Sequence, residues 1–126
     1  MPRFGRKSRR VLEGLNEDLQ ELLNEVIKYV DVSLIEGKRS LGRQKQLKKD
    51  GSTKTLNSKH LKGEAIDLAP YPIDWDDRER FIYISGIVKG IAYQMGIPII
   101  WGGDWNENQD LSDNNFDDLV HFELGY

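Results

Sequence analysis

The run Ser58-Lys59-His60-Leu61-Lys62-Gly63-Glu64-Ala65-Ile66-Asp67-Leu68-Ala69 joins a predicted strand to two potential metal ligands. Residues 65–69 are apolar apart from Asp67, which predicts a short buried strand. Seven extended residues would place His60 and Asp67 about 23 Å apart, so one metal ion can bind both only if the chain folds back. Gly63 suits such a turn. A buried carboxylate is costly unless it is paired, hydrogen-bonded or bound to metal, and a hydrogen-bonded core Asp67 is the alternative.

The second potential half of a metal site is Asp118-Leu119-Val120-His121-Phe122-Glu123. It contains the other of the chain's two histidines, within a predicted apolar strand where a hydrogen-bonded core histidine is the alternative. Two imidazoles and a carboxylate from His60, Asp67 and His121 would make a ligand set typical of catalytic zinc, with a further position for water. Asp118 would then accept the proton of that water. The combined pattern predicts metal-dependent hydrolysis.

The composition is that of a folded protein whose metal ligands are nitrogen and oxygen. The 126 residues are 38% hydrophobic and 31% charged, and we expect one domain over residues 1–126. Cysteine is absent, which excludes disulfides and thiolate ligands and favours zinc, with manganese, iron or cobalt as the alternatives in vitro. No apolar run is long enough to cross a bilayer, and no apolar segment follows the basic N-terminus. We therefore expect neither stable membrane insertion nor a secretory signal peptide.

Basic and acidic side chains are separated along the chain. A basic N-terminal arm covers about residues 1–10, whereas residues 101–126 contain seven acidic side chains and no lysine or arginine. The basic residues of the arm are Arg3, Arg6, Lys7, Arg9 and Arg10. The arm could contact nucleic acid, anionic lipid or anionic wall polymers, and the alternative is a solvated, partly frayed terminus. Because the net charge is −3 and no further basic stripe follows, we expect no nucleic-acid partner.

Helix and strand patterns follow one another without regular alternation. Apolar residues at three- and four-residue spacing predict a helix over 8–30 with Ser8 as its N-cap, and another over 74–95 with Asp74 as its N-cap. The other expected elements are a polar helix over 41–49, strands over 32–36, 65–69, 97–101 and 119–124, and loops over 50–60 and 102–117. This order favours an α+β fold with a small, mostly antiparallel sheet packed with two main helices.

Two spaced motifs resemble those of a known peptidase family. Ser-x-His-x-x-Gly-x-Ala-x-Asp at 58–67, followed by Asp-x-x-His at 118–121, resembles the zinc peptidases of the D-alanyl-D-alanine carboxypeptidase (VanY-type) family. The short chain, Arg39 and the segment Trp101-Gly102-Gly103-Asp104-Trp105 are most similar to the phage endolysin branch, which cleaves the L-alanyl-D-glutamate bond of peptidoglycan. The resemblance covers most of the chain, from about residue 35 to residue 121.

The resemblance implies a role for each motif residue. The implied zinc ligands are His60, Asp67 and His121. Asp118 would be the catalytic base, although the carboxypeptidase members more often have glutamate at this position. Arg39, which could otherwise be a surface arginine, would contact the substrate carbonyl or oxyanion, and Ser58 would bind substrate. The implied fold is the small α+β fold of D-alanyl-D-alanine peptidases, similar to that of hedgehog domains.

The acidic segment after residue 102 has donor spacing similar to the first half of a calcium loop. Its candidate calcium ligands are Asp104, Asn106, Asn108, Asp110 and Asp113. Gln109 replaces the usual turn glycine and Asn115 stands where a bidentate glutamate would be expected, so a solvated acidic loop is the alternative. Trp105 is expected to line a groove for the stem peptide or sugar, and Trp101 to be a packing residue.

Taken together, the sequence predicts a monomeric zinc-dependent endolysin that hydrolyses the peptidoglycan stem peptide. Without a signal peptide it would be made in the host cytoplasm and reach the wall after the membrane is permeabilised. A D-alanyl-D-alanine dipeptidase or carboxypeptidase on the same scaffold is the alternative enzyme. A binding module that keeps zinc for structure alone is the alternative outside enzymes.

Overall fold

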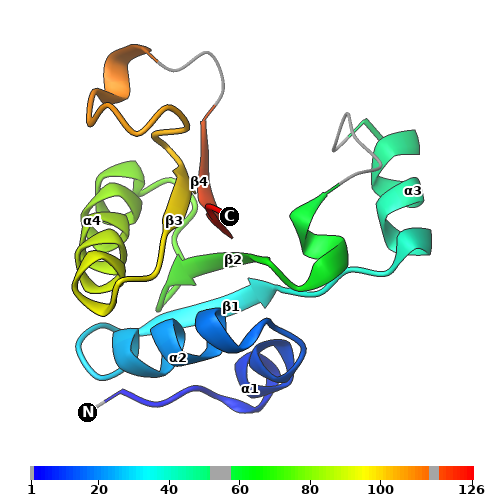
Figure 1. Ribbon diagram of the computed structural model, residues 1–126, viewed down its shortest axis with the longest axis horizontal. Coiled ribbons are helices and arrows are strands. Elements are labelled where there is room, and N and C mark those ends of the chain that lie inside the picture. The colour runs from blue at the N-terminus through cyan, green and yellow to red at the C-terminus, as the bar shows by residue number, and fades with distance from the viewer. Residues whose placement is uncertain (1, 52–57, 114–116) are drawn as a thin grey trace.

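A four-stranded antiparallel sheet organises the fold (Figure 1). The computed structural model describes residues 2–51, 58–113 and 117–126. The strands are β1 (Val32–Glu36), β2 (Ala65–Pro70), β3 (Ile99–Gly102) and β4 (Asp118–Leu124), in the order β1-β2-β4-β3. The two strands that contain Asp67 and His121 are therefore neighbours at the centre of the sheet. The expected α+β class with an antiparallel sheet is confirmed.

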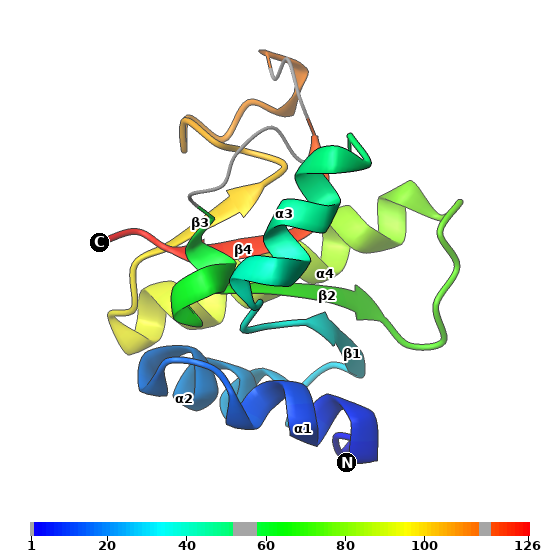
Figure 2. The same cartoon turned by 90° about the vertical axis from the view of Figure 1, so that its right-hand side faces the viewer.

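Within the described residues, four α-helices and two short 3-10 helices surround the sheet. They are α1 (Arg6–Glu13), α2 (Glu17–Val26), α3 (Leu41–Lys49), α4 (Arg78–Met95), η1 (Lys59–Lys62) and η2 (Leu111–Asp113). Figures 1 and 2 together show α3 and α4 on opposite sides of the sheet, with α1 and α2 along its β1 edge. No helix within the described residues is both long enough and apolar enough to span a bilayer.

The hydrophobic core lies between the sheet and the helices α2 and α4. Its fully buried members include Leu19, Leu22, Leu23, Val26, Leu34, Ile66, Leu68, Val88, Phe122 and Leu124. Side chains alternate between the two faces of a strand, so Ile66 and Leu68 enter the core while Asp67 faces the other way. Burial of one face of the sheet in the core therefore places Asp67 on the opposite face, where it is available to the site.

The expected single helix over 8–30 is wrong, because the chain breaks between α1 and α2. Asn16 caps α2 by accepting a hydrogen bond from the Asp18 N–H at 2.9 Å, and its own N–H binds the Gly63 carbonyl at 2.9 Å. Ser8 is not an N-cap but lies buried inside α1, where its hydroxyl accepts the Leu34 N–H at 3.0 Å. This contact satisfies a donor on the outer edge of β1.

The basic N-terminal arm is ordered rather than frayed. Residues 6–10 belong to α1, Phe4 is buried, and the Ser8 hydroxyl binds β1. The side chains of Arg3, Arg6, Lys7, Arg9 and Arg10 are all exposed, so the expected solvation of the arm is confirmed. The expected fraying is wrong, because an apolar anchor and a buried hydrogen bond attach the segment to the rest of the fold.

Several other element boundaries differ from the expected ones. Helix α4 begins at Arg78 with Asp77 as its N-cap, because the Asp77 carboxylate, and not that of Asp74, accepts the Arg80 N–H. Strand β3 begins at Ile99 because residue 97 still closes the end of α4, with its N–H bonded to the Ala92 carbonyl. Residues 59–60, expected to end the loop over 50–60, form η1 together with residues 61–62, and β4 begins one residue early, at residue 118.

Candidate metal centre and active site

The pairing of β2 with β4 brings the two sequence motifs together. Asp67 and His121 are direct partners in the antiparallel register, where side chains on one face lie close to each other. The His121 Nδ1 is 3.2 Å from the Asp67 Oδ1. Residues 54 positions apart in the chain thus become neighbours through a backbone ladder.

The other histidine reaches the same carboxylate through the turn expected at Gly63. Gly63 has φ +70° and ends η1, which folds the chain back so that the His60 Nε2 lies 3.3 Å from the Asp67 Oδ1. A Cβ on Gly63 would lie 2.8 Å from the Gly14 carbonyl oxygen, so the turn is packed as well as left-handed. The predicted fold-back at this glycine is confirmed.

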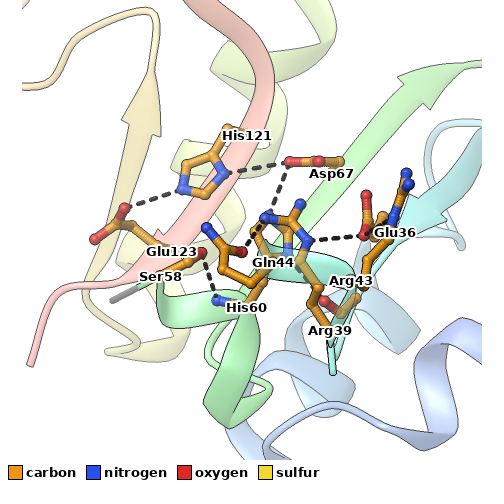
Figure 3. A network of polar contacts seen from close by, with 10 residues as sticks. Glu36, Arg39, Arg43, Gln44, Ser58, His60, Asp67, His121 and Glu123 are labelled. Carbon is orange, nitrogen blue, oxygen red and sulfur yellow. Dashed lines mark hydrogen bonds and ion pairs between the residues drawn. The ribbon is translucent and has the colours of Figure 1, made fainter. Parts of the chain in front are cut away.

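The three expected ligand residues converge on one point (Figure 3). One donor atom from each of His60, Asp67 and His121 lies within 4.8 Å of the other two. Both histidines are buried, and their ring centroids are 5.2 Å apart. Two nitrogens and one oxygen match the donor set of a catalytic zinc site, so the residues present fit a metal ion.

The charges at this centre favour a cation between the ligands. Burial opposes ionisation of Asp67, but hydrogen bonds from His121 and His60 outweigh it and hold the pKa of Asp67 well below its usual value. Burial likewise opposes the charge on His121, yet its hydrogen bonds to Asp67 and Glu123 raise its pKa to about 9. A metal ion between the ligands would replace the proton that Asp67 attracts to the His121 Nδ1.

Asp118 lies beside the metal ligands at the start of β4. Burial raises the pKa of Asp118 above its usual value, and the nearby charge of Asp67 raises it further against the opposing effect of the histidines. Gly102 of β3 pairs with Asp118, and a Cβ at Gly102 would overlap the Asp118 carbonyl. Glycine therefore permits the close strand approach at the proposed base, whose raised pKa favours proton uptake.

Arg39 is held at the centre rather than exposed as an ordinary surface arginine. Its side chain is only 8% exposed, its Nε donates to Glu36 at 2.8 Å, and a terminal nitrogen donates to Gln44 at 2.7 Å. Its backbone N–H binds the His60 carbonyl at 2.7 Å. Arg39 is also close enough to affect the pKa of Asp118. A guanidinium is thus fixed next to the candidate ligands.

The two expected substrate-binding residues also border the centre. The Ser58 hydroxyl accepts the His60 N–H at 3.2 Å, which caps η1. The Trp105 ring lies 5.4 Å from the His121 ring and is partly exposed. In contrast, Trp101 is buried, stacks on Phe122 and donates its ring N–H to a backbone carbonyl, so the expected packing role is confirmed.

Sequence reasoning assigned no role to three polar residues that contact the centre. Glu36 and Gln44 hold the Arg39 side chain, and Glu123 contacts the His121 Nε2 at 2.9 Å. The spacing of Glu123 could have identified it, because residues two apart on a strand share a face. Gln44 gave no comparable signal, because it lies in a uniformly polar helix and is buried only by tertiary packing.

The acidic segment forms a chain of side-chain to backbone turns next to β3. The Asp104 Oδ2 accepts the Gln109 N–H at 2.9 Å, and Gln109 has φ +65°, the left-handed conformation of a turn glycine. Asn106 and Asn108 accept the N–H groups two residues ahead, and Asp110 binds Ser112. Of the other expected positions, Asp113 ends η2 and Asn115 lies outside the described residues.

One oxygen of this segment stands apart from the others. Asp104 is 8% exposed, and its Oδ1 is buried without a hydrogen-bond partner among the described residues. Buried carboxylate oxygens are normally hydrogen-bonded or bound to metal. The first position of the possible calcium loop therefore has an unused acceptor.

Comparisons with known proteins agree with this geometry. The family model for phage L-alanyl-D-glutamate peptidase matches residues 1–125. The L-alanyl-D-glutamate peptidase of Escherichia phage T5 is 29% identical over 119 residues, covering 88% of this chain and 87% of that protein. The crystal structure of the Serratia marcescens L-Ala D-Glu endopeptidase ChiX is similar, with a TM-score of 0.79, 30% identity, and coverage of 97% of this chain and 90% of that one. The chain therefore belongs to the phage L-alanyl-D-glutamate peptidase family.

Proposed function

We propose that this chain is a zinc-dependent endopeptidase that hydrolyses the L-alanyl-D-glutamate bond of the peptidoglycan stem peptide. The observation that carries the proposal is the convergence of His60, Asp67 and His121 within 4.8 Å, with Asp118 beside them. The names of the T5 and Serratia relatives support the bond that is cut. We further propose that residues 1–126 act as one peptidase domain.

The residues around the centre suit hydrolysis of an amide. Zinc bound by His60, Asp67 and His121 would acidify a water molecule and polarise the scissile carbonyl. Asp118, whose pKa is raised by burial, accepts the proton of the attacking water and passes it to the leaving amine. Arg39 is held by Glu36 and Gln44, which directs a cation toward the charge that develops on the carbonyl oxygen.

Substrate binding is assigned to the residues at the border of the centre. Trp105 lies against the His121 ring with part of its surface exposed, so the stem peptide can pack on it. Ser58 lies at the start of η1, one residue before Lys59 and two before His60, and contributes a hydroxyl to the same border.

Digestion of purified peptidoglycan with the zinc-loaded protein tests the bond assignment. Mass spectrometry should find free L-alanine carboxyl ends and new D-glutamate amino ends, with zinc bound near one equivalent per chain. Release of D-alanine from the stem peptide instead would identify a D-alanyl-D-alanine carboxypeptidase. Cleavage of free D-alanyl-D-alanine into two D-alanine molecules would identify a dipeptidase.

Asp118→Ala distinguishes an enzyme from a module that keeps zinc for structure. In the enzyme, this variant retains zinc and fold but loses about 10²–10⁴-fold in rate, because the proton acceptor is gone. If the wild-type protein bound zinc yet cut no muropeptide under any condition, the structural module would be the correct reading.

We also propose that the segment from residue 104 to residue 113 binds calcium. The proposed ligands are Asp104, Asn106, Asn108, Asp110 and Asp113. The buried, unpartnered Oδ1 of Asp104 and the left-handed Gln109 support the loop geometry, although the side-chain oxygens also serve local turns. With zinc kept saturating, a calcium-selective chelator should lower activity, and unchanged activity would exclude a functional calcium site.

The setting of the reaction follows from the proposed substrate. We propose a monomer that forms no complex with nucleic acid, is made in the host cytoplasm and reaches the wall once the membrane is permeabilised. Lysis that begins only after addition of a pore-forming agent to expressing cells would support this order of events. Lysis without any such agent would contradict it.

A further inference from the structure

Glu123 lies two residues after His121 on β4, and its side chain turns to the same face of the strand. The Glu123 Oε1 is 2.9 Å from the His121 Nε2, and Figure 3 shows the carboxylate on the far side of the imidazole from Asp67. The Glu123 side chain is only 19% exposed and that of His121 only 11%. A carboxylate that is shielded from water and aimed at one ring nitrogen constrains that ring.

The two nitrogens of His121 face different partners. Nδ1 points to the Asp67 carboxylate at 3.2 Å, on the side of the converging ligands, whereas Nε2 points to Glu123. A neutral imidazole has one N–H and one lone pair, and a carboxylate can only accept a hydrogen bond. With the proton held on Nε2, the lone pair of Nδ1 is directed at the metal position.

His60 provides an internal comparison. Its Nδ1 is 2.8 Å from the Gly37 carbonyl oxygen and its Nε2 faces Asp67, so its outer nitrogen is fixed by the backbone. The two histidines therefore present opposite nitrogens to the centre. Of the two histidines, His121 has a side chain, Glu123, as the partner of its outer nitrogen, whereas the outer nitrogen of His60 faces a backbone carbonyl.

Lys59 connects this carboxylate to the other half of the centre. Its ammonium is 3.6 Å from the Glu123 Oε2, and it donates to the carbonyl oxygens of Leu124 and Tyr126. Lys59 immediately precedes His60 on η1, so one side chain joins η1 to the end of β4. The ammonium binds Oε2 and leaves Oε1 for the imidazole.

We propose that Glu123 is a positioning residue that fixes the tautomer and ring orientation of His121 for metal binding, and that Lys59 holds Glu123 in place. The inference rests on the proposed metal centre and assigns residues that act on a ligand without touching the metal. Partners of this kind typically contribute 10- to 100-fold to metal affinity.

Zinc affinity of the full chain, measured at one pH by competition with a chromophoric chelator, tests the proposal. Glu123→Leu removes the acceptor and should weaken zinc binding about 10- to 100-fold. Glu123→Gln keeps an oxygen that can accept the Nε2 hydrogen and should lose only a few-fold. Glu25→Gln is the matched control, because Glu25 contacts Lys28 and Tyr29 on the surface of α2, and it should bind zinc like the wild type.

Nitrogen-15 NMR of the zinc-loaded proteins reads the tautomer directly. The wild type and Glu123→Gln should show a proton on the His121 Nε2 that exchanges slowly with water. In Glu123→Leu this proton should exchange rapidly, and Lys59→Met should fall between the two, because the carboxylate remains but is less constrained. A general loss of fold would affect all the amide signals instead of this one proton.

Two results separate this inference from the proposed function. If Glu123→Leu bound zinc as tightly as the wild type and protected the His121 Nε2 proton equally, the positioning role of Glu123 would be wrong. The proposed hydrolase function would not be affected by that result. If the wild type bound zinc but cut no muropeptide, the proposed function would fail, and weaker zinc binding by Glu123→Leu would still support the role of Glu123.

Discussion

The candidate metal centre and the acidic loop from residue 104 to residue 113 both bring potential ligand atoms together, but they do so by different means. At the centre, Asp67 and His121 meet because β2 and β4 pair, and His60 arrives through a packed left-handed turn. In the loop, side-chain oxygens bind N–H groups only two to five residues ahead. Long-range backbone pairing thus builds the first site, whereas local turns build the second.

This difference predicts how each region responds to amino-acid substitutions. Ligand atoms already held by a buried ladder need little ordering when a metal binds, so the centre is preorganised. Oxygens that serve local turns must reorient before they can surround one cation. Substitutions at the centre should therefore have large effects, and substitutions in the loop smaller ones.

Removal of a ligand at the centre should have the largest effect. His121→Ala or His60→Ala is expected to abolish zinc binding and hydrolysis together, because two remaining ligands cannot hold a catalytic zinc. Metal content and muropeptide turnover are the measurements. Full activity in either variant would show that the reactive site lies elsewhere.

The packed turn at Gly63 can be tested against an unpacked one. Gly63→Ala should cost about 4 kcal/mol of unfolding free energy, from left-handed strain plus a collision with the Gly14 carbonyl. Gly96 has a similar φ of +71° with no atom within 4 Å of a Cβ, so Gly96→Ala should cost only about 1–2 kcal/mol. Equal losses in denaturant titrations would mean that the packing at Gly63 is unimportant.

The charges at the centre predict a pH dependence of the metal-free protein. Folding raises the pKa of His121 from 6.5 to about 9, so the protonated ring stabilises the fold fully below pH 6.5. That stabilisation, on the order of 3 kcal/mol, should decline as the pH rises and be lost above about 9. Asp67 has a lowered pKa, so its contribution is present above its usual 3.8 and is lost in acid.

Thermal unfolding between pH 6 and 10 checks this expectation. The midpoint of the metal-free protein should fall across the interval, whereas the zinc-loaded protein should change less because a metal ion replaces the proton. Parallel curves for the two forms would contradict a shared position for proton and metal.

The smallest effects are expected in the acidic loop. Asp104→Asn should raise the calcium concentration needed for half-maximal stimulation of hydrolysis by about 5- to 150-fold. The reason is that the substitution removes negative charge at a buried carboxylate. Glu107→Gln, an exposed carboxylate paired with Lys89, is the control and should change little. The zinc affinity of both variants should match that of the wild type. Loss of zinc binding in Asp104→Asn would show that the two regions are coupled and not separate.

Much of the candidate site was predictable because its residues are of types that bind metal and lie in two short segments of the sequence. With two histidines and no cysteine, the ligands were limited to nitrogen and oxygen donors, and the distance between His60 and Asp67 required a turn that Gly63 provides. Periodicity located the strands that contain Asp67 and His121. Periodicity failed at residues 14–16, because the apolar spacing continues across a break made by a cap and a contact to Gly63.

The sequence alone therefore determined which residue types are available as candidate ligands and which strands carry two of them. Only the tertiary structure decided that Asp67 pairs with His121, that Arg39 is held by the buried Gln44, and that Glu123 and Lys59 link the two halves of the centre. The physical reason is distance along the chain. Local spacing encodes local conformation, whereas contacts between β2, β4, η1 and α3 depend on strand register and on the burial of the core that fixes it.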